Sequence, residues 1–152
     1  MKPIINALVL IAVAGSARAE KNPLELLAEQ AALAMAPDAG RLGEFFPGQG
    51  KRTQWQVLME QGRCYVLSGA AGGGAKKMAV YLWGPDGQRI TENRSPTLLA
   101  SLQHCAAVTG MHKFEGKTAG DGPWVVGLYQ KGAPKQAIKD KPAPVAGACP
   151  SS

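Results

Sequence analysis

The segment GRCYVLSGAAGGGAKK, residues 62–77, joins a short apolar run to four glycines and two lysines. A phosphate-binding loop has this outline, but its glycine run ends in Gly-Lys-Ser or Gly-Lys-Thr and opens a helix. Here Ala75 follows the last glycine, and a second strand-like run follows the lysines. The dinucleotide-binding pattern fails as well, because Lys77 stands where its third glycine belongs. We therefore expect residues 69–77 to be an exposed, flexible connection between two strands.

A second group with chemical potential is HCAAVTGMH, which contains His104, Cys105, Met111 and His112. Imidazole, thiolate and thioether groups are ligands for copper. Blue-copper sites, however, assemble these ligands from separated positions, and adjacent residues such as His104 and Cys105 point to opposite faces of a strand. Cys105 is also a good disulfide candidate. The sequence therefore predicts neither a metal site nor a cofactor.

Hydrolytic catalysis has little support. The chain has only two histidines and no Gly-x-Ser-x-Gly elbow. Paired carboxylates could come from Asp86, Glu92, Glu115 and Asp121, but Asp86 and Asp121 lie in PDG and GDGP, where turn formation accounts for them. We expect no enzyme activity, and a small hydrolase with an unrecognised site is kept as an alternative.

Residues 1–19 have the form of a secretory signal peptide. Lys2 precedes an apolar run, and Ala17 and Ala19 form an Ala-x-Ala cleavage site that puts the mature start at Glu20. The apolar run is shorter than the roughly 20 residues that span a bilayer. No cysteine follows the cleavage site for a lipid anchor. We expect a periplasmic or extracellular protein with no membrane span once the signal is removed.

The mature chain is modestly basic. Without Lys2 and Arg18, 15 basic residues stand against 11 acidic ones, a net charge of +4 over 133 residues. That length suits one domain. The basic residues are spread along the chain rather than concentrated, which argues against nucleic-acid binding. Weak affinity for anionic polymers such as cell-envelope glycans remains open.

Three cysteines occur, Cys64, Cys105 and Cys149. An exported setting favours disulfides over catalytic thiols. Cys64 and Cys105 both end apolar segments inside the domain, whereas Cys149 lies in the tail KPAPVAGACPSS. We predict the pair Cys64–Cys105, with Cys149 free or available for an intermolecular bond.

The pattern of elements is mainly β. Residues 20–40 contain a short helix over PLELLAEQAALAM, with Asn22 as N-cap and Pro23 in the first turn, and then a linker. From Arg41, turn signals recur about every ten residues, which is typical of a sandwich of seven or eight short strands. Residues 97–105 could be a helix by composition, but the β context favours a strand. The sequence thus predicts a single antiparallel, jelly-roll-like β-sandwich over residues 41–131. It predicts a flexible tail rich in proline, alanine and lysine over residues 132–152.

Aromatic residues fall on the predicted strands, where core packing is their usual fate. Trp83 and Trp124 stand beside turns and are expected to be partly exposed. Together with Lys76 and Lys77 they are the candidate partner-binding residues.

Several of these segments together resemble the bacterial pre-peptidase C-terminal domain and related secreted jelly-roll modules. The matching positions are Gly62, Cys64 and Tyr65; Tyr81, Leu82, Pro85, Asp86 and Gly87; and residues 124–129, within a match over residues 41–131. The resemblance implies an accessory domain for secretion, folding or surface binding, without catalysis. Some relatives bind calcium through acidic residues in the strand before the Pro-Asp-Gly turn, but this chain has Met78, Ala79 and Val80 there.

The sequence therefore predicts an exported, non-catalytic binding or accessory module of the bacterial cell envelope, whose partner is a protein or an envelope polysaccharide. One alternative is a structural subunit or secreted inhibitor in a larger envelope assembly.

Overall fold

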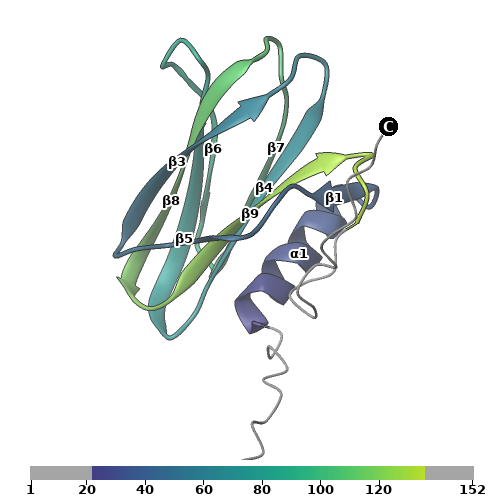
Figure 1. The fold of residues 1–152 in the computed structure, drawn as a ribbon. Helices are drawn as coiled ribbons and strands as arrows, with labels where there is room; N and C mark the ends of the chain where they lie inside the picture. The colour runs from purple at the N-terminus through teal and green to yellow at the C-terminus, as the bar shows by residue number, and fades with distance from the viewer. Residues whose placement is uncertain (1–21, 136–152) are drawn as a thin grey trace, which may run out of the picture.

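The computed structural model describes residues 22–135 as one helix and nine strands (Figure 1). The predicted signal peptide, Cys149 and most of the predicted tail lie outside the described residues. The elements are α1 (Pro23–Met35), β1 (Ala39–Arg41), β2 (Phe46–Pro47), β3 (Arg52–Met59), β4 (Cys64–Ala71), β5 (Gly74–Trp83), β6 (Arg89–Ser95), β7 (Leu99–Cys105), β8 (Gly110–Asp121) and β9 (Trp124–Lys131).

Helix α1 has the bounds and the cap that the sequence predicts. The Asn22 side chain accepts a hydrogen bond from the Leu24 amide at 3.0 Å, and Pro23 occupies the first turn, where its missing N–H costs nothing. The helix ends at Met35, two residues before Pro37, which cannot continue it.

The strands form a two-layered sandwich. A five-stranded sheet has the order β1-β9-β4-β7, with β2 also paired to β9, and a four-stranded sheet has the order β3-β8-β5-β6. All pairings are antiparallel, and the β4–β7 ladder confirms a strand over residues 99–105. The strands pair as in one long hairpin whose turn lies at residues 84–88 and which is folded over itself. Its successive pairs are β5–β6, β4–β7, β3–β8 and β1–β9. This is the strand order of a jelly roll, as predicted.

The glycine-rich segment differs from its prediction. Strand β4 continues to Ala71 and β5 begins at Gly74, so that only Gly72 and Gly73 join the two sheets. Gly73 takes a φ of +58°, which glycine adopts at no steric cost. Gly69 is buried in β4, and a Cβ atom there would lie 2.4 Å from Cε of Met78. The predicted connection was too long, because these glycines allow close packing and a tight crossing between sheets, but Gly73 and the two lysines are exposed as expected.

Two apolar clusters hold the fold together. The larger lies between the sheets and includes Leu67, Val80, Leu82, Phe114 and Leu128. The smaller lies between α1 and the outer face of the five-stranded sheet, where small residues let the helix approach closely. That arrangement places α1 against β4 and β9 (Figure 1). One outer face of the sandwich is thereby covered.

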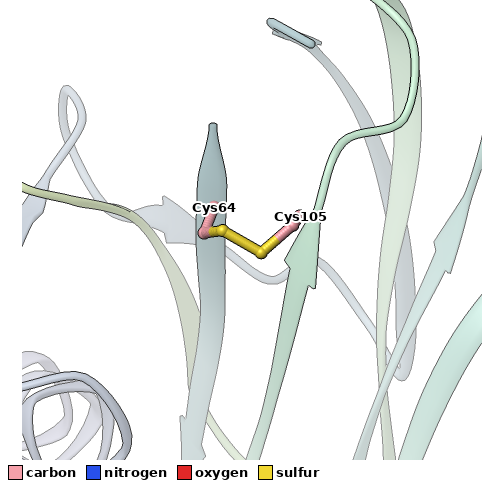
Figure 2. The surroundings of a disulfide bond; sticks show 2 residues. All are labelled: Cys64 and Cys105. Atoms are coloured by element: carbon pink, nitrogen blue, oxygen red, sulfur yellow. A yellow bond between two sulfur atoms is a disulfide. The ribbon is translucent and has the colours of Figure 1, made fainter. Parts of the chain in front are cut away.

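The disulfide joins Cys64 and Cys105, which are direct partners in the β4–β7 ladder (Figure 2). The predicted pairing is therefore present. Its two residues lie at the ends of their strands, with Cys105 exposed and Cys64 half-buried. The bond fixes β7, an edge strand of the five-stranded sheet, to the more central β4.

Candidate functional site

The outer face of the four-stranded sheet carries a row of charged and aromatic side chains from three neighbouring strands. Because side chains alternate along a strand and paired residues point the same way, the register identifies this row. Tyr81 of β5 is paired with Glu115 of β8 and Glu92 of β6, and Trp83 with Lys113 and Arg89. Ala79 is paired with Lys117 and Arg94 in the same manner. We call the following residues the basic face: Lys77, Tyr81, Trp83, Arg89, Arg94, Lys113 and Lys117.

Two stacked rings form the centre of the basic face. The rings of Tyr81 and Trp83 have centres 5.9 Å apart and an interplanar angle of 27°. The guanidinium carbons of Arg89 and Arg94 each lie 5.8 Å from the Tyr81 ring centre, and Nζ of Lys113 lies 4.7 Å from that of Trp83. These distances fall within the range of cation–π attraction. The rings therefore hold three cations close to one another.

Carboxylates neutralise only part of this charge. Glu92 accepts hydrogen bonds from Arg89 at 3.1 Å and from Arg94 at 2.8 Å. The bond to Glu92 raises the pKa of Arg94, which keeps it charged. Glu115, which is buried, pairs with Arg52 and accepts a hydrogen bond from Gln54 at 3.2 Å.

With Arg52 included, six cations stand against these two carboxylates on one face. The outer face thus carries a net charge of +4, although the sequence suggested that the basic residues were spread.

A hollow of about 400 Å³ opens beside the stacked rings. Ala79 and Ala119, whose side chains are small, line it together with Tyr81 and three cations, Lys77, Arg94 and Lys117. The hollow is thus a shallow depression with positive charge around it. Its lining suits an anionic group.

The predicted partner-binding residues are only partly brought together. Lys77 lines the hollow and Trp83 is half-exposed farther along the same strand. Lys76 is exposed at the register shift between Ala75 and Lys77, outside the lining of the hollow.

Trp124, by contrast, is only 2% exposed, so the prediction that it is partly exposed was wrong. Its indole Nε1 donates a hydrogen bond to the Gly50 carbonyl at 2.7 Å, and its ring packs against Trp55 at 5.7 Å. A Cβ atom on Gly48 or Gly116 would overlap the Trp124 ring, which shows how closely the backbone surrounds it. A turn next to a tryptophan does not by itself expose the ring.

Sequence reasoning did not identify Tyr81, Arg89, Arg94, Lys113 and Lys117 as site residues. The signal was present in the alternation of charges along β8, where Lys113, Glu115 and Lys117 occupy every second position. What the alternation could not show was that β5 lies beside β8 and that β6 lies on the other side of β5.

The His104, Cys105, Met111 and His112 group does not form a single site. Cys105 is in the disulfide, and Met111 is exposed on the outer face of the four-stranded sheet. His104 and His112 point inward and approach each other. Within residues 22–135, no group of three or more histidine, cysteine or acidic side chains is placed to hold a metal ion.

The candidate catalytic carboxylates also have structural partners. Oδ1 of Asp86 accepts a hydrogen bond from the Gln88 amide at 3.1 Å in the hairpin turn, and the exposed Asp121 lies 3.8 Å from Nζ of Lys51. Glu92 and Glu115 are engaged by arginines on the basic face.

No known family model matches the chain, and no curated protein matches it. Among the described residues, no helix is long and apolar enough to cross a membrane.

Proposed function

We propose that this protein is an exported, non-catalytic binding module of the bacterial cell envelope, and that its basic face binds an anionic polysaccharide. The observation that carries the proposal is the Tyr81–Trp83 stack, surrounded by cations on the sheet face that α1 leaves uncovered. The resemblance to pre-peptidase C-terminal domains, with their accessory role, agrees with it.

The chemistry of the basic face suits a charged sugar chain. The half-exposed Trp83 ring offers a flat apolar surface on which a sugar ring can stack, whereas Tyr81 is only 8% exposed and supports Trp83 through the stack. The nearby guanidinium and ammonium groups can pair with carboxylate, sulfate or phosphate substituents, and arginine does so with two parallel hydrogen bonds. A flat sheet with a shallow hollow accepts an extended polymer without enclosing its ends.

The test is affinity for polygalacturonate, a uronic-acid polymer, with neutral dextran as the comparison. We expect the W83A variant to bind polygalacturonate roughly tenfold more weakly, because a lost stacking surface is worth on the order of 1 kcal/mol. The double variant R94A/K117A should bind more weakly still and show a smaller dependence on salt.

The control for loss of a positive charge is R63A. Arg63 lies just before β4, away from the basic face, and its guanidinium pairs with Glu60 at 2.6 Å. This variant should bind as the wild type does. Equal losses in R63A and R94A/K117A would contradict the proposal, as would unchanged binding in W83A. Crosslinking in an envelope fraction that yields one specific protein through the basic face would favour a protein partner instead.

A further inference from the structure

The only two histidines of the chain meet between the sheets. His104 lies on β7 of the five-stranded sheet and His112 on β8 of the four-stranded sheet, and their ring centres are 6.1 Å apart. Their strands belong to different layers, so the contact is formed only by the closing of the sandwich. This pair lies away from the basic face, and an inference from it stands independently of the proposed function.

The tautomer of His112 follows from its hydrogen bond. Its Nδ1 lies 3.0 Å from the Gly110 carbonyl oxygen, which can only accept, so that Nδ1 carries the hydrogen of the neutral ring. The lone pair then resides on Nε2. His112 is 1% exposed, and among the described residues we find no hydrogen bond to Nε2. A ring whose Nδ1–H is bonded to a backbone carbonyl and whose Nε2 is available is the usual state of a metal-ligating histidine.

His104 is half-buried on the opposite side. The two rings face each other across the interior with an interplanar angle of 49°.

The two rings line a cleft of about 500 Å³ at this end of the sandwich. Its other walls are mainly apolar and include Pro85, Ile90 and Val108, and Asp86 contributes the one carboxylate of the lining. Bound water or a small ligand can thus reach a metal held between the rings.

We propose that His104 and His112 bind one divalent transition-metal ion of the zinc, copper or nickel class between the sheets. Two rings bound to one ion through bonds of about 2.0–2.1 Å have centres roughly 5 to 6 Å apart, depending on the angle at the metal. The observed separation of 6.1 Å needs little adjustment. Imidazole ligands select these metals over calcium and magnesium. Because no third protein ligand is already in place, water completes the coordination and the affinity is modest.

The experiment uses the disulfide-intact mature protein, freed of metal with EDTA and dialysed. A C149S background removes the third cysteine, which could bind metal on its own. Titration with ZnCl₂ in a calorimeter should give one site per chain, and saturating zinc should raise the thermal unfolding midpoint. CaCl₂ should do neither.

H104A, at the half-buried position, should weaken zinc binding at least tenfold and abolish the shift in unfolding midpoint. H104Q, with a side chain of similar size, separates loss of the ligand from loss of packing and should behave in the same way. With CuCl₂, electron paramagnetic resonance should show hyperfine coupling to two nitrogens in the parent protein and to one in H104A. Absence of saturable zinc and copper binding would overturn the proposal, and so would equal binding by the parent protein and H104A.

Discussion

On the outer face of the five-stranded sheet, small and β-branched side chains meet the alanines of α1, whereas the outer face of the four-stranded sheet presents rings and cations. Ala28 and Ala32 of the helix are fully buried against Val66 and Val125. Strand β4 is consequently buried on both faces, while β3 alternates between exposed and covered residues. One outer face therefore serves stability, and the other is left uncovered by the helix.

The largest expected effect comes from placing the same charge on each face. A32E puts an unpaired carboxylate into the helix–sheet contact and should lower the free energy of unfolding by about 4 kcal/mol. A79E puts it on the basic face opposite Lys117 and Arg94, where it should change stability by less than about 0.5 kcal/mol. Urea unfolding measures both. Similar losses in the two variants would contradict the distinction between the faces.

Removal of the disulfide should come next in size. The bond closes a segment with a sequence separation of 41, and the double variant C64A/C105A should lose about 3 to 4 kcal/mol by the chain-entropy estimate. Thermal and urea unfolding test this, with C149A as the control that should match the wild type. Peptide mapping without reduction should show Cys64 joined to Cys105. A Cys64–Cys149 peptide, or three free thiols, would refute the pairing.

A smaller effect should follow from loosening the covered face. The Ser68 hydroxyl donates a hydrogen bond to the Ala28 carbonyl at 2.7 Å and lies 2.9 Å from the Ser101 hydroxyl. S68A should cost about 1 kcal/mol and speed amide hydrogen exchange in α1 more than in β8. The control is S95A, since the Ser95 hydroxyl bonds only within its own exposed turn. If amide hydrogen exchange in S68A were equally faster in α1 and in all strands, the substitution would have destabilised the whole domain and the prediction would be wrong.

The smallest effect concerns pH. Partial burial raises the pKa of Glu29 on α1, against the opposing influence of Arg41. Below the ordinary carboxyl pKa of about 4, Glu29 is protonated in both states and has no effect on stability. As the pH rises through that value and then through the folded pKa, the unfolded chain loses its proton first and stability falls. E29Q should therefore be slightly more stable than the wild type at pH 7 and equal to it at pH 3. Lower stability of E29Q at pH 7 would show that attraction to Arg41 dominates.

Local patterns in the sequence predict many of the elements. The cap Asn22, the first-turn Pro23 and the stop before Pro37 define α1 without any tertiary information. The alternation from Thr53 to Met59 predicts β3, and the positions of the first two cysteines predict their bond. The helix and strand signals depend on residues that are close in the sequence, and the disulfide prediction depends on the small number of ways in which three cysteines can pair.

The candidate site was less predictable. Trp83 and Lys77 were identified, but Trp124 was assigned to the surface, and five members of the basic face were missed. Whether a strand tryptophan is buried depends on which sheet covers it, and Trp124 lies under Gly48 and Gly116, residues remote from each other in the sequence. Glycine-rich composition likewise suggested mobility, because sequence alone does not reveal that Met78 fills the space beside Gly69.

The sequence by itself thus determined the helix, most strands, the cysteine pairing and the sandwich class, since these follow from side-chain period, capping and turn chemistry. Only the tertiary structure decided which face is covered, which cations share one surface and that His104 meets His112. These depend on the order of strands within each sheet and on the closing of two sheets, which bring together residues whose separation in the chain carries no local signal.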